Sequence, residues 1–272
     1  MPELPEVETT RRGLAPHAQD ATLTRLKIRD HRLRWPVDPA LADLVADRKI
    51  ESLGRRGKYL LIQLQGDRCL ILHLGMSGRV RAVPAGTPPQ RHDHVDFVLN
   101  NGNTLRFTDP RRFGSLHGIA GSPLIHPLLR SLGPEPLTQA FNGHYLWAHS
   151  RQRRMPVKAY IMDSHVVVGV GNIYAAEALY RAGIHPARAA GRIAAQRYDR
   201  LADTIKAVLG EAIAAGGTTL RDYRGSNDDP GFFQQDLFVY GRGHQPCRGC
   251  GRALRSIRLA QRATVYCPRC QR

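Results

Sequence analysis

Two matched cysteine pairs, Cys247-Arg-Gly-Cys250 and Cys267-Pro-Arg-Cys270, stand sixteen residues apart near the C-terminus. This spacing is typical of a zinc ribbon, in which four thiolates bind one tetrahedral ion, and a redox-active pair is the alternative. From residue 237 onward the chain has eight arginines and no aspartate or glutamate. A segment this short builds little core of its own. We therefore predict one structural Zn²⁺, bound by all four cysteines, in a basic finger suited to nucleic acid.

The rest of the chain shares this basic character. Its 272 residues include 40 Lys and Arg against 23 Asp and Glu, a net charge of +17. Such an excess indicates a polyanionic partner, and charge that only keeps the protein soluble is the alternative. The sequence has no signal peptide and no apolar run of transmembrane length, so we expect a cytoplasmic, nucleoid-associated protein with no membrane partner. The fifth cysteine, Cys69, is expected to be a core residue on a strand.

The first half of the chain is mostly extended in character. We predict a leading helix from Leu4 to about Gly13, stopped by Pro16, and a short helix over 41–46. Apolar or alternating runs with turn signals between them predict a β-sandwich or barrel. The expected strands are 22–29, 59–64, 69–74, 95–99 and 104–108, the last two joined by a turn at Asn100-Asn101-Gly102.

After Gly133-Pro134-Glu135-Pro136 the pattern becomes helical. Helices are expected over 140–150, 156–163, 172–182 and 194–215, the last ended by Gly216-Gly217. Residues 221–235 form a polar, glycine-containing loop that we expect to order around a ligand. The chain is therefore interpreted as an α+β multidomain protein: an N-terminal β-sandwich with a leading helix (1–131), a helical domain with its loop (132–235), and the zinc ribbon (236–272).

The first eight residues, Met1-Pro2-Glu3-Leu4-Pro5-Glu6-Val7-Glu8, suggest chemistry. Removal of Met1 would leave Pro2 as a secondary amine that attacks carbon and forms an iminium. An α-amino group has a pKa of about 7.7–8.0, against about 10.4 for lysine, so a larger fraction of it is unprotonated and nucleophilic at neutral pH. Glu3 and Glu6 are candidates for acid and base work. In the alternative interpretation, the prolines only stiffen a chain end and the glutamates favour a helix N-terminus.

Further stretches accompany Pro2–Thr9 along the chain. They are Gly57-Lys58-Tyr59-Leu60, His73-Leu74-Gly75-Met76-Ser77-Gly78, Asp109-Pro110-Arg111-Arg112-Phe113-Gly114, Gly169-Val170-Gly171-Asn172-Ile173-Tyr174, and the cysteine ribbon with Gln261-Arg262-Ala263-Thr264. Together, and in this order, these stretches resemble the formamidopyrimidine-DNA glycosylases, bifunctional enzymes that remove oxidised purines and nick the abasic site. The resemblance covers essentially the whole chain.

The resemblance implies a catalytic set. Pro2 would attack C1′ of the damaged nucleotide and form a Schiff base, with Glu3 as the proton donor. Lys58 would transfer protons in β-elimination, although an isolated lysine would ordinarily be solvated. Arg262 would act in δ-elimination, or clamp a phosphate, since guanidinium rarely gives up a proton.

The resemblance also implies a set of DNA contacts. Met76, Arg111 and Phe113 would fill the gap left by the flipped nucleotide. Core packing is the alternative for Met76 and Phe113, but their glycine neighbours favour exposed loops. The other expected contacts, mainly with phosphates, are His73, His92, Arg112, Arg153, Lys158 and Asn172, together with Arg262.

The helices over about 135–220 would then be a helix-two-turns-helix module, and residues 218–235 would close over the flipped purine. We expect a monomer that excises 8-oxoguanine opposite cytosine, and formamidopyrimidines, from damaged double-stranded DNA and nicks the site by β,δ-elimination. Two alternatives stay open: an oxidised-pyrimidine glycosylase of the sister group, and a non-catalytic binder of damaged DNA.

Overall fold

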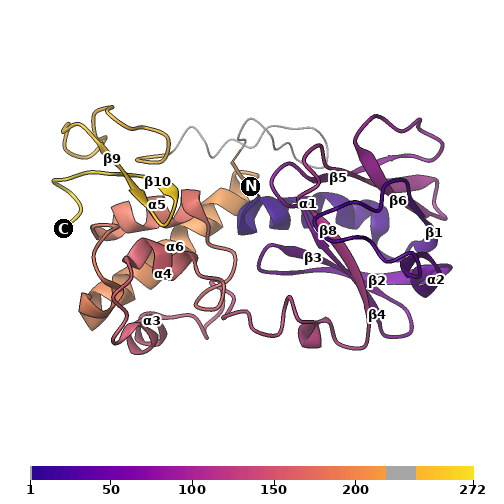
Figure 1. The fold of residues 1–272 in the computed structure, drawn as a ribbon, viewed down its shortest axis with the longest axis horizontal. Helices are drawn as coiled ribbons and strands as arrows, with labels where there is room; N and C mark the ends of the chain where they lie inside the picture. The colour runs from indigo at the N-terminus through magenta and orange to yellow at the C-terminus, as the bar shows by residue number, and fades with distance from the viewer. Residues whose placement is uncertain (1, 219–236) are drawn as a thin grey trace. The chain divides into compact units, whose positions relative to one another are not determined.

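The structure is a computed structural model that describes residues 2–218 and 237–272 (Figure 1). The described residues fall into two compact units. The N-terminal unit comprises residues 2–130 and 215–218, and the C-terminal unit comprises residues 131–214 and 237–272. The predicted boundaries of three domains stay predictions.

Among its described residues, the N-terminal unit contains one sheet of eight antiparallel strands, in the order β5-β7-β6-β1-β2-β3-β4-β8. Strands β1 and β2 pair only through Thr22–Lys49 and Leu23–Arg48, so the sheet divides there into two four-stranded halves. The strands are β1 (Thr22–Ile28), β2 (Arg48–Arg56), β3 (Tyr59–Leu64), β4 (Arg68–His73), β5 (Arg79–Pro84), β6 (Asp93–Leu99), β7 (Asn103–Thr108) and β8 (Ser115–Ala120).

One apolar core joins the two halves of the sheet. On β3, buried and half-buried residues alternate, so Leu60, Ile62 and Leu64 face inward as a half-buried strand requires. They belong to the same buried cluster as Phe97 and Phe107 from the other half. The predicted β-sandwich is therefore confirmed. Cys69 is fully buried on β4, as expected of a core residue.

Three of these strands, β2, β5 and β8, were not predicted. Their sequences carry arginine, glycine or proline, and none shows a clean two-residue alternation of buried and exposed positions. Pairing with neighbouring strands, rather than local sequence preference, makes them extended.

Helix α1 (Leu4–Ala18) packs against β2, β3, β5 and β7. The expectation that Pro16 stops it is wrong, because the helix ends two residues later. A proline in the last turn removes only one backbone bond, and the amide of Gln19 still donates to the Ala15 carbonyl at 3.0 Å. The short helix α2 (Leu41–Val45) packs against β1 and β8, and a 3₁₀ turn, η1 (Pro123–Ile125), follows β8.

The C-terminal unit contains four α-helices among its described residues. They are α3 (Gly143–Ser150), α4 (Val157–Met162), α5 (Asn172–Ala182) and α6 (Ala195–Ala214), with a 3₁₀ turn, η2 (Ala190–Arg192), before α6. Helix α6 packs its apolar stripe, which includes Leu201, Ile205 and Leu209, against α3 and α5. Helix α3 starts three residues later than predicted because the Asn142 side chain accepts the Tyr145 amide at 2.8 Å and caps it.

A hairpin of β9 (Arg255–Leu259) and β10 (Arg262–Tyr266) forms the ribbon, and α5 packs against β10. Its two-residue turn, Ala260-Gln261, has positive φ at both positions, the backbone that a tight hairpin requires. The predicted ligand-ordering loop, residues 221–235, lies entirely outside the described residues. No described helix is both long and apolar enough to cross a membrane.

A buried carboxylate ties α1 to the sheet. Glu8 accepts hydrogen bonds from Arg11 and Arg12 at 2.8 Å and pairs with Arg55 of β2 at 3.3 Å. Burial alone would raise the pKa of Glu8, but the hydrogen bonds from Arg11 and Arg12 outweigh it and lower the pKa from its usual 4.5 to about 2. The charged form is therefore favoured in the folded state.

We expect Glu8→Gln to lower the free energy of unfolding by about 1–2 kcal/mol at pH 7, after allowance for solvent screening. Because the folded pKa lies below the ordinary value, this stabilisation is present above pH 4.5 and is lost as pH falls towards 2. Urea unfolding at several pH values measures it. Exposed Glu51→Gln on β2 is the control, and equal losses in both variants would contradict the role of Glu8.

Candidate active site and metal centre

Pro2 and Glu3 are buried where the chain enters α1. The Glu6 carboxylate holds this chain end: one oxygen accepts the Glu3 backbone amide at 2.8 Å, and the other accepts the Thr218 amide at 2.9 Å. Gly217 precedes Thr218 and has a positive φ of 84°, which favours glycine. A Cβ at this position would also lie only 3.2 Å from a Glu6 oxygen. Glu6 thus accepts one backbone amide on each carboxylate oxygen, a geometry suited to positioning the chain end, and its predicted part in acid–base catalysis stays a prediction.

Lys58 lies in the two-residue turn between β2 and β3, beside His73 at the end of β4. Burial, and then the charges of Lys58 and Arg34, lower the pKa of His73 to about 4. The ring is therefore neutral at pH 7. Its Nδ1 accepts the Gly75 amide at 3.0 Å, so Nε2 carries the proton and can donate to an anion.

The expected wedge residues lie on two loops that touch. A Cβ on Gly75 would collide with the backbone of Phe113 and Gly114, so the Met76 loop and the Phe113 loop are in contact. Phe113 is 43% exposed, and the Arg111 guanidinium lies 4.7 Å from its ring centroid. Core packing is therefore excluded for Phe113, and Met76 is half-buried.

Asp109 builds the second of these loops. Its carboxylate is fully buried and accepts bonds from the Ser77 hydroxyl at 2.7 Å and the Gly114 amide at 2.8 Å. Its own amide donates to the His92 carbonyl at 3.0 Å. Asp109 thus connects the two wedge loops to the segment that carries His92. Sequence reasoning did not single it out, although Asp-Pro is a known turn signal.

Arg112 has a positive φ of 56° and pairs with Asp30 at 3.3 Å. Hydrogen bonds from Arg32, followed by the charge of Arg112, lower the pKa of Asp30 well below its usual range. The side chain of Arg112 remains 40% exposed, so a second anion has access to it.

The other expected DNA-binding residues lie in the C-terminal unit. Arg153 is exposed after α3, and Asn172 begins α5. Lys158, on α4, is only 1% exposed, and its Nζ donates to the Ala263 carbonyl at 3.2 Å and the Thr264 hydroxyl at 2.8 Å. Lys158 thus fastens the ribbon hairpin to α4, and its direct contact with phosphate stays a prediction.

Asn172 also donates to the Ala263 carbonyl, at 3.3 Å. Arg262, the next residue back along β10, is exposed. It lines a pocket of about 140 Å³ with Lys158, Ala159, Met162, Asp163, Leu259 and Ala260. Lys158 and Asn172 together fix the position of Arg262 on the C-terminal unit.

The four paired cysteines converge as predicted. Their sulfur atoms all lie within 4.8 Å of one another, with Cys250–Cys267 at 3.5 Å and Cys247–Cys270 at 4.0 Å. Zinc–sulfur bonds of about 2.3 Å in a tetrahedron place sulfurs about 3.8 Å apart, so these residues fit the ion. Burial raises the pKa of the remaining thiol, Cys69, to about 11, which leaves it protonated and apart from this chemistry.

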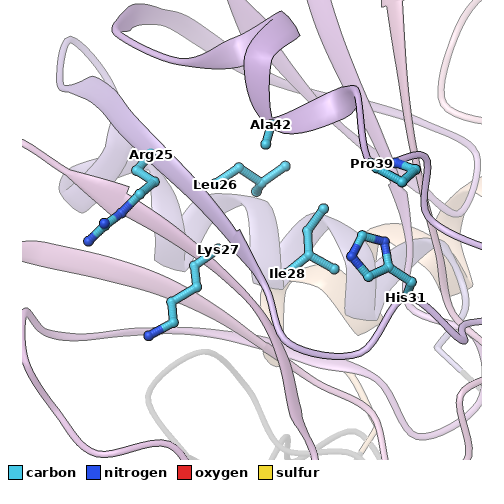
Figure 2. Close-up of a pocket in the computed structure, with 7 residues that line it drawn as sticks. All are labelled: Arg25, Leu26, Lys27, Ile28, His31, Pro39 and Ala42. Carbon is cyan, nitrogen blue, oxygen red and sulfur yellow. The ribbon is translucent and has the colours of Figure 1, made fainter.

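A larger pocket of about 360 Å³ lies elsewhere in the N-terminal unit, between β1 and α2 (Figure 2). Figure 2 shows Arg25 and Lys27 extending away from Leu26 and Ile28, whose side chains face α2. None of the predicted catalytic or DNA-binding residues lines it. This pocket is therefore separate from the predicted catalytic and DNA-binding residues.

Comparisons with known proteins agree with this geometry. The Formamidopyrimidine-DNA glycosylase N-terminal domain matches residues 1–116, the Formamidopyrimidine-DNA glycosylase H2TH domain matches 132–224, and the zinc finger found in FPG and IleRS matches 245–272. Formamidopyrimidine-DNA glycosylases of Alkalilimnicola ehrlichii and Pseudomonas aeruginosa are 57% and 58% identical over 278 and 273 residues, covering both chains completely.

The chain belongs to the formamidopyrimidine-DNA glycosylase family.

Solved structures extend the similarity to the fold. The MutM (FPG) protein of Thermus thermophilus has 41% identity and a TM-score of 0.89, with coverage of 99% of this chain and 98% of that one. A Lactococcus lactis FPG variant in complex with Fapy-dG-containing DNA has 32% identity and a TM-score of 0.92, with complete coverage of both. The chain is thus a DNA glycosylase of base excision repair, with a helix-two-turns-helix domain, one structural zinc and DNA as its partner.

We expect Gly75→Ala to weaken binding to a duplex with an abasic-site analogue by about tenfold or more. Its Cβ would separate the wedge loops, and its φ of 68° adds backbone strain of about 1–2 kcal/mol. Gly86→Ala is the matched control, because Gly86 has φ 84° but nothing within 4 Å of a Cβ. Titration by fluorescence anisotropy compares the two, and equal weakening would show that strain alone is responsible.

Proposed function

We propose that this chain excises oxidised purines, 8-oxoguanine opposite cytosine and formamidopyrimidines, from duplex DNA and then nicks the abasic site by β,δ-elimination. The observation that carries the proposal is the buried pair Pro2 and Glu3 at the head of α1, held by Glu6. Lactococcus lactis FPG has been solved with Fapy-dG-containing and with abasic-site-containing DNA, which supports the same substrate class here.

Base loss begins with the Pro2 nitrogen, which must first be freed by removal of Met1, a residue outside the described part of the chain. The nitrogen lone pair forms a bond to C1′ as the glycosidic bond breaks. The purine leaves with the electron pair of the broken glycosidic bond and takes up a proton, and the Pro2 nitrogen loses its own N–H proton. Glu3 then gives a proton to O4′, so the sugar ring opens and an iminium links C1′ to Pro2.

Strand cleavage follows from the acidity of that iminium. Loss of a C2′ proton expels the 3′ phosphate, and loss of a C4′ proton then expels the 5′ phosphate, which are the β and δ steps. We assign Lys58 to proton transfer in the first step. Arg262 serves the second as a cation on the leaving phosphate, since guanidinium keeps its proton.

When the enzyme binds DNA, the damaged nucleotide turns out of the duplex, so that its C1′ can reach Pro2. Met76, Arg111 and Phe113 fill the space of the everted nucleotide, and the cationic and imidazole groups around them bind phosphates. Closure of the 218–235 loop over the purine belongs to the proposal as well, and nearly all of that loop lies outside the described residues. We propose that the enzyme acts as a monomer in the cytoplasmic compartment that holds the chromosome.

Borohydride trapping on a duplex with one 8-oxoguanine opposite cytosine tests the nucleophile. We expect Pro2→Gly to lose about 10²-fold or more of the trapped complex, the scale of removing one catalytic group, while binding is largely kept. Pro5→Ala, at the other proline of this chain end, is the control and should trap normally. Intact mass must show that Met1 is absent. Undiminished trapping in Pro2→Gly, or removal of thymine glycol but not 8-oxoguanine, would overturn the proposal.

Binding should also weaken steeply with salt, because several phosphate contacts release counterions. Six or more such contacts predict a loss of about 10³-fold between roughly 50 and 200 mM salt. Anisotropy titrations on undamaged duplex measure the slope. A flat response would contradict a basic phosphate-binding surface.

A further inference from the structure

Helix α5 carries a hydroxyl group that contacts one cysteine of the metal centre. The Tyr180 hydroxyl lies 3.2 Å from the Cys247 sulfur. Tyr180 is half-buried, and its ring stacks on Phe238 with centroids 5.4 Å apart and an interplanar angle of 24°. The stacking holds the ring, so the hydroxyl has a defined direction towards the sulfur.

The face of α5 that carries Tyr180 contacts the ribbon at several points along the helix. Asn172, Ala176 and Tyr180 are spaced four residues apart, which places them on one face of the helix. Asn172 donates to Ala263 of β10, and Ala176 packs in the small apolar cluster that contains Cys247 and Cys267. Tyr180 completes this face with a polar contact to a metal ligand.

Gly249 shows how closely the Tyr180 hydroxyl approaches the backbone of the knuckle. A Cβ added to Gly249 would lie 2.8 Å from the Tyr180 hydroxyl oxygen and 3.9 Å from the Cys247 sulfur, with no other atom outside its own chain neighbours within 4 Å. The second distance is an ordinary contact. Only the hydroxyl therefore excludes a side chain at this position of the knuckle.

We propose that Tyr180 is an outer hydrogen-bond partner of the zinc centre, donating its O–H to the Cys247 thiolate and slowing loss of the ion. A zinc-bound thiolate is an acceptor, and tyrosine is then the donor. Such a bond reduces the charge on sulfur and fixes its direction, and removal of outer partners typically costs 10–100-fold in metal affinity. The bond also fastens the zinc knuckle to the helix that begins at Asn172.

The test is zinc transfer from the purified, zinc-loaded full-length protein to excess chromophoric chelator. Tyr180→Phe keeps the ring and its stacking, and we expect it to release zinc about tenfold faster than the parent protein. Tyr145→Phe is the matched control, since Tyr145 is also half-buried and its hydroxyl donates to the Val166 carbonyl at 2.9 Å, away from the cysteines. Equal release rates in the two variants would overturn the proposal.

Cobalt substitution gives a signature that a general loss of stability would not. Loss of a hydrogen bond makes a thiolate a stronger electron donor, so the sulfur-to-cobalt charge-transfer band should move to longer wavelength in Tyr180→Phe and stay fixed in Tyr145→Phe. An unchanged band in Tyr180→Phe contradicts a bond to the ligand sulfur.

A double-mutant cycle that combines Gly249→Ala with Tyr180→Phe tests whether the two residues act together. In the parent protein, Gly249→Ala should displace the hydroxyl and accelerate zinc release as Tyr180→Phe does. In the Tyr180→Phe background it should add little, because the atom it would meet is absent. Effects that multiply in the double variant would show that Gly249 acts independently of Tyr180, against the proposal.

Discussion

The proposed nucleophile sits at a chain end, which is ordinarily among the least ordered parts of a protein. Here that end is fixed by one carboxylate. Glu6 accepts the amide of Glu3 with one oxygen and the amide of Thr218 with the other, so two segments more than two hundred residues apart depend on the same side chain. A carboxylate with both oxygens engaged in this way is well suited to hold geometry, and the remaining chemistry depends on that geometry.

Buried carboxylates that accept backbone amides also shape other loops. Asp109 accepts the Gly114 amide and so shapes the wedge loop. Glu177, buried on α5, accepts three successive amides, those of residues 238, 239 and 240, at 2.8–2.9 Å. These three buried carboxylates bind backbone amides and do not face solvent, so they take little from the positive charge of the surface.

The parts of the fold that could be predicted are those governed by local rules. The cysteine spacing predicted the metal centre, and the periodicity of residues 172–182 predicted α5 with its observed bounds. Strand β2 was missed because its burial follows neighbouring strands rather than its own alternation. Pro16 misled because the cost of a proline depends on its distance from the helix end.

The residues of the site also fall into those that local sequence could predict and those that it could not. Pro2 and Glu3 were predicted from their chemistry and from a family resemblance, and the structure places both in buried positions at the start of α1. Asp109 and Tyr180 act through contacts with residues distant in the chain, which spacing does not reveal. Glu177 did carry a signal, a charged residue within the apolar run Ala175–Leu179, where only a buried partner would make it tolerable.

The contact between Gly75 and the backbone at Phe113 and Gly114 has a consequence for protein engineering. Two surfaces that leave no room for a methyl group cannot be redesigned one at a time. A library that randomises the Met76 loop alone would be filtered by fit to the unchanged Phe113 loop before any selection for a new lesion could act. Productive variants should arise as paired changes, and the two loops should be inherited as a single module when they are grafted onto another scaffold.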